Sequence, residues 1–542
     1  MATLTTLFES ALRNRGNAVA MRHKQCGIWH EITWSALGAR TAAIAEVLHG
    51  SAIQRHDRVA IVAENGPDWV AAELATLQAG AVVVGCYPML TDDELERVLA
   101  QTSPSLIFVD DADQEYRIRR LAVSNVALVP FSRVKVCTNA SAGGVRRLDT
   151  STADDTALIT TTAGTSGPCT LVHLTHANLI AGAEALKARL GLGTEDETVS
   201  VLPLGHPAEQ AMSVVMPMLA GSRTSFAESA RTLGTDLAEV EPTVILAMPR
   251  LWQRLYLDLW MAIDNTGGWR GRLVRRAIPD WESDSKPITG PSQFFIGKPV
   301  RRRLGLARAR VGLSIGARLP KRIATGFASL GIQLLDAYGG AEMGGVVALG
   351  MPGEPASALQ GVELRADGTD RHVYVRGAQV PTYANVAGGW LETGDIGLVA
   401  DNAVQAMARV HGRAQAADCT VAETELEMSS YVRHAIVTAA EGGLAAVVCL
   451  EPVTLGQWAN KQKIKFTDFT SLVKTNEVVR LMEGIIGEVN AKRAAGVRVV
   501  QYAIYEERLS VERRELTPVF TLRYQRMYEW IGSNCSFTRL GA

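Results

Sequence analysis

One segment of the 542-residue chain combines an apolar run with a loop of small polar residues. Residues 157–159 are apolar, and residues 160–167 read Thr-Thr-Thr-Ala-Gly-Thr-Ser-Gly. Glycines let a backbone turn and approach a ligand closely, and backbone NH groups and hydroxyls donate hydrogen bonds to phosphate oxygens. The segment therefore fits a phosphate-binding loop, and it fits a polar turn between two strands equally well. It is not a Walker A loop, because no Gly-Lys-Ser/Thr follows it.

The loop must be positioned by the secondary structure around it, and the sequence there alternates short apolar runs with helical patterns. Such runs occupy residues 59–63, 81–84, 106–109 and 244–247. Short buried strands separated by helices are typical of parallel sheets that helices cover on both faces. We therefore expect an α/β fold for the large N-terminal part of the chain.

A composition shift near residues 406–417 divides the chain. The residues before it are rich in glycine and β-branched side chains, and about 125 residues of higher charge follow it. That length suits one small α+β domain behind a hinge. We predict a large N-terminal domain over residues 1–410, a hinge over 411–417 and a small C-terminal domain over 418–542.

Composition and charge exclude several classes of protein. The chain has 55 Lys and Arg against 56 Asp and Glu, so no charge excess indicates a nucleic-acid partner. Its seven cysteines form no Cys-x-x-Cys pattern, which favours reduced thiols in a cytosolic protein over a zinc site or a disulfide framework. The charge-free stretches over residues 74–91 and 156–183 contain glycine and proline, so we expect buried segments there and not membrane spans.

The N-terminus lacks the basic and apolar pattern of a signal peptide. We therefore expect a cytoplasmic protein. The basic residues 270–276 and 301–303 are most simply a solvated surface, and they leave open a peripheral contact with an anionic membrane.

The loop and its sequel resemble the signature of the adenylate-forming superfamily, which includes acyl-CoA synthetases, luciferases and nonribosomal adenylation domains. In that family the loop reads Thr-Ser-Gly-Thr-Thr-Gly-x-Pro-Lys-Gly-Val, and Leu-Thr-His-x-Asn-Leu follows. The resemblance covers roughly the whole chain, and several segments look like the long-chain fatty acyl-CoA synthetase branch. The matching segments are Leu-Thr-His-Ala-Asn-Leu (174–179), Leu-Pro-Leu-Gly-His (202–206), Met-Pro-Arg-Leu-Trp (248–252), Tyr-Gly-Gly-Ala-Glu (338–342), Thr-Gly-Asp (393–395), Gly-Arg (412–413) and Glu-Leu-Thr-Pro (515–518).

The resemblance implies a large N-terminal domain with parallel-rich α/β sheets and a small β-subdomain, followed by a small mobile α+β domain. It also implies binding of ATP or AMP, Mg²⁺ and coenzyme A, with a small-molecule carboxylic acid or acyl ligand as the partner. In the family a carboxylate attacks the α-phosphorus of ATP and releases pyrophosphate. The small domain then rotates, and a thiol such as coenzyme A takes the acyl group.

The same resemblance implies roles for single residues around one pocket. These are phosphate binding by Thr162, Gly164, Thr165, Ser166 and Gly167; adenine binding by Tyr338 and Gly339 against Gly316 and Ala317; ribose binding by Asp395 and Arg413; Mg²⁺ binding by Glu342; and an acyl entrance at His206.

This sequence departs from the family pattern where the chemistry is expected. Thr170 stands at the lysine position of the phosphate loop, and Thr521 stands at the catalytic lysine position of the last motif. Ala341 replaces a threonine, and residues 412–416 lack the lysine and aspartate of the hinge motif. Loss of one preorganised donor typically costs ~3–4 kcal/mol in transition-state stabilisation, or roughly 10²–10³ in rate.

Three functions are compatible with this pattern. The first is ATP-dependent activation of a fatty or other apolar acid, with acyl-adenylate formation, acyl-CoA ligation and weakened activity. The second is a non-catalytic pseudoenzyme that binds a nucleotide or acyl ligand, paired with an active paralogue or with another copy of itself. The third is a repurposed adenylation-fold enzyme of a specialised pathway. Resemblance over the full length favours the first.

Overall fold

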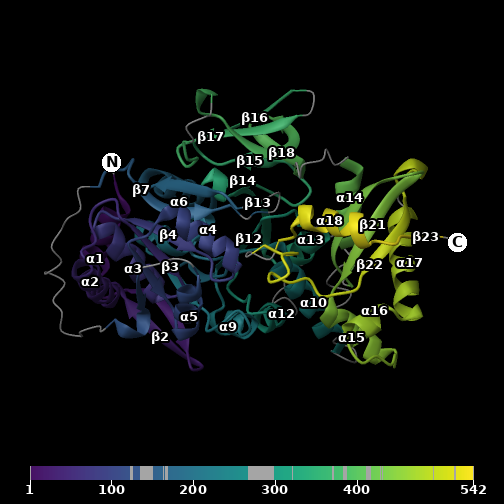
Figure 1. Cartoon of the computed structure of the whole chain (residues 1–542), viewed down its shortest axis with the longest axis horizontal. Coiled ribbons are helices and arrows are strands. Elements are labelled where there is room, and N and C mark those ends of the chain that lie inside the picture. The colour runs from purple at the N-terminus through teal and green to yellow at the C-terminus, as the bar shows by residue number, and fades with distance from the viewer. Residues whose placement is uncertain are drawn as a thin grey trace.

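The computed structural model contains two mixed sheets in the large N-terminal part and a third sheet in a smaller C-terminal domain (Figure 1). The N-terminal elements and the small domain lie at opposite ends of the long axis (Figure 1). The structure describes residues 2–121, 126–134, 151–162, 164, 169–265, 298–319, 321–368, 371–382, 387–409, 417–427, 429, 431–491, 493–517 and 521–540.

A six-stranded sheet holds the segment of the predicted phosphate loop. Its strands are parallel except for the last pair, β7 and β8, which are antiparallel. In spatial order they are β6 (Ala127–Pro130), β5 (Leu106–Val109), β3 (Arg58–Val62), β4 (Val82–Cys86), β7 (Thr156–Thr161) and β8 (Leu171–Thr175).

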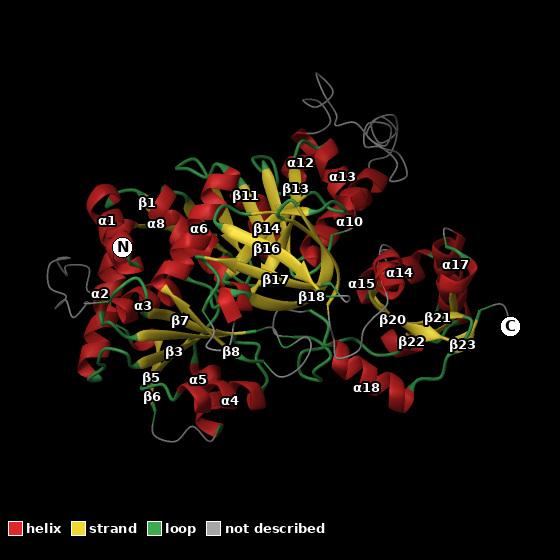
Figure 2. Ribbon diagram, turned by 90° about the horizontal axis from the view of Figure 1, so that it is seen from above, coloured by secondary structure: helices red, strands yellow, loops and turns green. Residues whose placement is uncertain are grey.

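Helices cover both faces of this sheet, as the alternation of side chains along its strands requires (Figure 2). Val59 and Ile61 of β3 belong to the hydrophobic core with α2 and α3, whereas Ala60 and Val62 belong to the core with α4 and α5. The helices are α2 (Trp34–Gly50), α3 (Pro67–Gln78), α4 (Asp92–Thr102), α5 (Ala112–Arg120) and α6 (His176–Leu190).

A thirteen-stranded sheet forms the rest of the large part. Six neighbouring strands, from β13 to β1, are parallel, and the others are antiparallel. In spatial order the strands are β16 (Val362–Asp367), β17 (His372–Gly377), β18 (Leu391–Ala400), β19 (Ala403–Arg409), β15 (Ala356–Ala358), β14 (Gly345–Gly350), β13 (Gln333–Gly340), β12 (Val311–Ile315), β11 (Val244–Ala247), β9 (Glu197–Ser200), β10 (Arg223–Phe226), β1 (Val19–Gln25) and β2 (Ile28–Thr33).

The antiparallel strands β15–β19 correspond to the expected small β-subdomain, and the short strand β15 joins them to the parallel part. The described helices beside this sheet are α1 (Leu4–Arg15), α7 (Pro207–Glu209), a π-helical segment (Gln210–Val215), α8 (Met216–Ala220), α9 (Leu233–Val240), α10 (Pro249–Asn265), α12 (Lys298–Arg303) and α13 (Lys321–Ser329).

The small domain has its own sheet and its own hydrophobic cores. The strands follow the order β20 (Val432–Ala440), β21 (Gly443–Leu450), β22 (Val499–Tyr505) and β23 (Thr538–Arg539). The helices are α14 (Ala417–Glu427), α15 (Pro452–Lys461), α16 (Phe469–Val473), α17 (Asn476–Ala491) and α18 (Tyr524–Asn534). The expected α/β fold with a smaller α+β domain is thus confirmed, while the boundary at 410 and the hinge, of which 411–416 lie outside the described residues, stay predictions.

Two expectations about the surface and the thiols can be compared with the structure. Cys86, Cys169, Cys419 and Cys449 are buried as free thiols, as expected for small apolar groups. Arg301 does not fit the expected solvated surface, because its guanidinium donates to backbone carbonyls, among them Leu306 O at 3.0 Å. Among the described helices, none is both long and apolar enough to cross a bilayer.

Candidate functional site

The predicted phosphate loop begins where β7 ends. Thr170, at the position where the family carries lysine, closes this loop on Thr162. The Thr162 NH donates to Thr170 O (2.9 Å), the Thr170 NH donates to Thr162 Oγ1 (3.0 Å), and the two hydroxyl oxygens are 3.2 Å apart. Gly164 has a φ of +69°, which favours glycine. Thr165, Ser166 and Gly167 lie outside the described residues, so the loop's phosphate role stays a prediction.

Tyr87 links the loop to the neighbouring strand β4. Its hydroxyl lies 3.3 Å from Thr160 Oγ1 and 3.4 Å from Thr161 O, and the side chain is buried. Burial raises the pKa of the Tyr87 phenol above its ordinary range, and the negative charge of Glu342 raises it further. Glu342 therefore lies close to the start of the loop, although it follows β13 in a different sheet.

Glu342 and His206, two predicted site residues, lie near each other. Burial lowers the pKa of His206 to about 4, and the charge of Glu342 opposes this shift. His206 Nδ1 accepts the Ala208 NH at 3.2 Å and caps α7, which makes the neutral imidazole with the proton on Nε2 the expected form. The structure thus supplies a neutral histidine beside a carboxylate.

Tyr338 and Asp395 join the parallel part of the large sheet to the β-subdomain. The Tyr338 hydroxyl on β13 lies 2.8 Å from Asp395 Oδ2 and 3.1 Å from Thr393 Oγ1, both on β18. Asp395 is buried, and its NH donates to Thr393 Oγ1 at 3.1 Å. The predicted adenine and ribose residues are therefore in direct contact.

The two glycines between Tyr338 and Glu342 have close neighbours of different kinds, and only Gly339 meets backbone atoms. A β-carbon on Gly339 would lie 2.0 Å from Gly345 O on the adjacent strand β14. A β-carbon on Gly340 would lie 2.7 Å from Glu342 Oε2, so this carboxylate lies over the backbone of Gly340. The backbone contact at Gly339 holds β13 close to β14 just before the turn that carries Glu342.

Gly316 and Ala317 follow β12, the strand next to β13, and both are exposed. Gly316 has a φ of +101°, and a β-carbon there would lie 3.9 Å from the methyl carbon Cγ2 of Thr521. Thr521 belongs to the small domain, and its hydroxyl oxygen lies 2.6 Å from Thr517 Oγ1. The residue at the family's catalytic lysine position thus lies at the predicted adenine wall.

The ends of parallel strands bring most predicted residues together. Thr162, Gly316 and Tyr338 lie at the carboxyl ends of β7, β12 and β13, the usual place for ligand sites in α/β sheets. Arg413 lies outside the described residues.

Two residues near the loop were not predicted from the sequence. Tyr87 contacts Thr160 and Thr161, and the charge of Glu94 acts on Cys169 after the loop. The Thr-x-x-Glu pattern of Thr91 and Glu94 predicts a helix start at this position, but it does not predict that Glu94 also pairs with Arg523.

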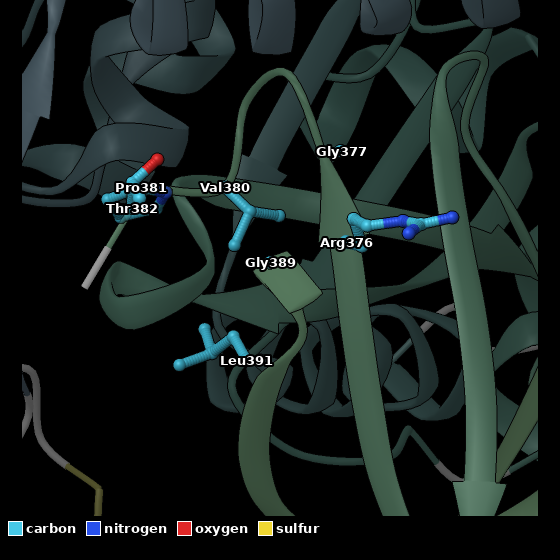
Figure 3. A pocket seen from close by; sticks show the side chains of 7 residues that line it. All are labelled: Arg376, Gly377, Val380, Pro381, Thr382, Gly389 and Leu391. Carbon is cyan, nitrogen blue, oxygen red and sulfur yellow. The ribbon is translucent and has the colours of Figure 1, made fainter. Parts of the chain in front are cut away.

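A separate hollow of about 230 Å³ lies in the β-subdomain. Figure 3 shows its lining side chains, with Arg376 extending away from Val380 and Leu391. Arg376 pairs with Glu363 at 2.5 Å and lies over the Trp390 ring. This hollow contains none of the predicted site residues, so it is not the candidate site. Its lining residues are Arg376, Gly377, Val380, Pro381, Thr382, Gly389 and Leu391.

Comparison with known proteins gives matches over most of the chain. The family described as AMP-binding enzyme matches residues 8–374. The long-chain-fatty-acid–CoA ligase heimdall of Drosophila melanogaster is 26% identical over 68% of this chain, and the match spans 63% of that protein. The long-chain-fatty-acid–CoA ligase FadD15 of Mycobacterium tuberculosis is 23% identical over 94% of this chain and 92% of its own length.

Solved structures share the fold over nearly the whole chain. The O-succinylbenzoate coenzyme A synthetase of Bacillus subtilis in complex with AMP has a TM-score of 0.67 at 16% identity, covering 96% of this chain and 97% of that one. ATP-bound MatB from Rhodopseudomonas palustris has a TM-score of 0.71 at 18% identity, covering 98% and 99%.

Proposed function

Because the chain belongs to the AMP-binding enzyme family, we propose that it catalyses ATP-dependent carboxylate activation with a fatty or other apolar acid. The carboxylate displaces pyrophosphate from ATP to give an acyl-adenylate, and the coenzyme A thiol then displaces AMP to give the acyl-CoA thioester. Two relatives are named long-chain-fatty-acid–CoA ligases, which supports an apolar acid as the substrate.

The convergence of Gly316, Tyr338 with Asp395, and Glu342 with His206 at neighbouring strand ends is the observation that carries this proposal. The surroundings fit a nucleotide. The hydroxyls of Thr161 and Ser314 are buried without a hydrogen-bond partner in the described part of the chain, and they stand at the ends of β7 and β12. Two residues after Ser314, a β-carbon on Gly316 would meet only Thr521 within 4 Å among the described residues.

Asp395 would accept from the ribose hydroxyls, and Thr162 would donate to phosphate. Among the described residues no group of three or more His, Cys, Asp or Glu could hold a metal ion. Mg²⁺ is commonly held by one or two carboxylates together with substrate phosphates, so Glu342 is a suitable ligand for Mg²⁺ that arrives with ATP. The ion would neutralise phosphate charge there.

The proposed activity is weaker than that of a lysine-bearing enzyme. The Thr170 and Thr521 hydroxyls are engaged with the hydroxyls of Thr162 and Thr517. A hydroxyl cannot supply the positive charge of an ammonium group at a developing phosphate charge, and each missing donor costs roughly 10²–10³ in rate. We therefore propose slow adenylation, limited by charge and not by the shape of the pocket.

Pyrophosphate release tests this function. The wild type is incubated with ATP, Mg²⁺ and a panel of acids from acetate to palmitate, in parallel with the double variant Thr170→Lys/Thr521→Lys. Release that depends on an apolar acid and rises about tenfold or more in the double variant supports the proposal. Thr538→Lys, an exposed threonine of the small domain, is the matched control and leaves the rate unchanged. No release from either protein with any acid contradicts the proposal.

A second candidate is binding without turnover, because both threonines at lysine positions are held by neighbouring hydroxyls. It predicts AMP or acyl binding in calorimetry without product, and association with an active paralogue or a second copy. A third is thioester formation alone, which depends less on the position of Thr521. A ready-made acyl-adenylate with coenzyme A tests it directly.

A further inference from the structure

The small domain contacts the large one through the first turn of α4. Three acidic residues, Asp92, Asp93 and Glu94, occupy this turn. Arg514 of the small domain pairs with Asp93 at the exposed edge of the contact. Arg523 of the small domain pairs with Glu94, with 2.5 Å between Nη2 and Oε1.

The Glu94–Arg523 pair is nearly buried, with side-chain exposures of 7% and 11%. Both oxygens of Glu94 are used, because Oε2 accepts the Thr91 NH at 3.1 Å and the Thr91 hydroxyl at 3.0 Å. Removing one partner of a buried pair leaves the other charge uncompensated, which disfavours the arrangement strongly. An exposed pair such as Arg514–Asp93 contributes little. The buried pair therefore dominates this contact.

Arg523 also holds the segment that carries Thr521. Its Nε donates to Leu516 O at 3.1 Å, and Leu516 forms a β-bridge with Leu522. Within this turn the Thr517 NH donates to Thr521 O at 2.8 Å. The guanidinium of Arg523 therefore connects the turn that carries Thr517 and Thr521 to α4 of the large domain.

A third ion pair across the two domains lies away from α4. Arg250, at the start of α10, pairs with Glu451 of the small domain at 3.0 Å. Arg433 of the small domain lies near both partners, so that Arg250 repels it and Glu451 attracts it. Two separated contacts restrict rotation of the small domain better than one, and only Glu94–Arg523 is nearly buried on both sides.

We propose that Glu94 and Arg523 are positioning residues that hold the small domain where Thr521 lies against Gly316, and that this favours acyl-adenylate formation over thioester formation. The inference rests on the proposed function, since it assigns the pair to the first of the two half-reactions. Breaking the pair frees the small domain to leave this orientation. The first half-reaction then slows because the small-domain segment around Thr521 leaves Gly316 at the proposed adenine wall, and the loss comes from the position of this segment and not from a charge on Thr521. A reaction that begins from the finished adenylate does not need Thr521 at Gly316.

The test compares the two half-reactions in variants of the full chain. Arg523→Gln and Glu94→Gln are measured for pyrophosphate release from ATP with dodecanoate, and for thioester formation from dodecanoyl-adenylate with coenzyme A. Each variant is expected to lower kcat of the first half-reaction about tenfold or more, and to leave the second within about twofold. The double variant is expected to be no worse than either single one, because both remove the same interaction.

Two further variants separate positioning from general damage. Arg523→Lys keeps the charge and is expected to recover part of the lost rate. Arg526→Gln is the matched control, because Arg526 is exposed and pairs with Glu529 inside α18. Equal loss in both half-reactions, or no loss in the first, overturns the inference.

Hydrogen exchange tests the same pair without turnover. Arg523→Gln is expected to lose amide protection in the first turn of α4 and in residues 521–523, and Arg526→Gln is not. Unchanged protection in Arg523→Gln overturns the positioning role. If the wild type releases no pyrophosphate and forms no thioester while Arg523→Gln still loses protection, the proposed function is contradicted and the structural role of the pair stands.

Discussion

The Tyr338 hydroxyl lies 2.8 Å from Asp395 Oδ2 and so connects β13, which carries the turn of Glu342, to β18 of the β-subdomain. Asp395 is buried, and a buried carboxylate needs hydrogen-bond donors. This hydrogen bond therefore fixes the orientation of the Asp395 side chain, the predicted ribose-binding group, in the absence of a nucleotide. Under the proposed function, the strength of nucleotide binding would then also depend on Tyr338, a residue predicted only to lie beside adenine.

Replacing Tyr338 by phenylalanine tests this dependence. The variant removes a donor from Asp395, and hydrogen bonds to charged groups contribute about 1.5–3 kcal/mol. We expect the free energy of unfolding to fall by roughly this amount and AMP affinity to fall several-fold, as measured by urea denaturation and calorimetry. Tyr116→Phe is the control, because Tyr116 is 66% exposed. Unchanged stability and affinity in Tyr338→Phe would show that the bond does not position Asp395.

The Gly339 backbone leaves no room for a side chain. A β-carbon there would lie 2.0 Å from Gly345 O, and a backbone atom cannot move away as a flexible side chain can. We expect Gly339→Ala to destabilise the protein by ~1–3 kcal/mol or more. A β-carbon on Gly484 of α17 would meet no described atom within 4 Å outside the backbone of its own helix, so Gly484→Ala is expected to stabilise the helix by ~0.5–1 kcal/mol. Urea denaturation of both variants checks the opposite signs.

Glu73 gives the protein a stability that depends on pH. This buried carboxyl accepts Gln210 Nε2 at 3.2 Å, and burial raises its pKa to about 8. The folded state thus holds the proton more tightly than the unfolded chain, whose glutamates titrate near pH ~4.3. The stabilisation is complete below that pH and is lost as the pH rises toward 8.

We expect Glu73→Gln, which stays neutral, to remove this loss. Wild type and variant should have similar free energies of unfolding at pH 4, and the variant should be more stable by roughly 3–5 kcal/mol at pH 8. Denaturation curves at both pH values check this. Glu354→Gln, at an exposed position, should leave the pH dependence as in the wild type. Parallel pH dependence of wild type and Glu73→Gln would contradict a protonated Glu73.

His206 is expected to stay neutral throughout the physiological range. Burial lowers its pKa to about 4, and Nδ1 accepts the Ala208 NH. Nitrogen NMR should therefore show one neutral tautomer with the proton on Nε2, and its resonances should not shift between about pH 5.5 and 8. The spectrum of His206→Gln identifies the signal among ten histidines. A midpoint near the ordinary value of about 6.5 would contradict the burial of this ring.

The elements of the large domain could be predicted from local patterns. The runs at residues 106–109 and 244–247 are strands β5 and β11 with those bounds, because a short buried strand of a parallel sheet is apolar throughout. The predicted run 81–84 is shifted, since β4 spans Val82–Cys86 and includes a glycine that the apolar pattern did not count. The loop connects the antiparallel strands β7 and β8, so it is a polar turn between two strands. This arrangement does not exclude the other interpretation, a phosphate-binding loop.

Long-range partners could not be predicted in the same way. Glu94 and Arg523 are separated by 429 positions, and neither pattern nor spacing indicates that a capping glutamate also pairs with the last motif. The Tyr338–Asp395 bond likewise joins strands that are not neighbours in the sheet. The family resemblance implied that Tyr338 binds adenine and that Asp395 binds ribose. Neither role predicts that the two side chains contact each other.

The threonine pair that closes the predicted loop, Thr162 and Thr170, has a consequence for how an anion is received. No lysine or arginine occurs between Asp155 and Glu184, so this part of the chain is electrically neutral apart from its histidines. Under the proposed function, the positive charge that balances a phosphate here would come from a metal ion or from basic residues of other segments, such as Arg97 on α4, whose charge acts on Cys169 after the loop. Under the proposed function, added salt should therefore weaken nucleotide binding by screening charges that lie on other segments of the chain.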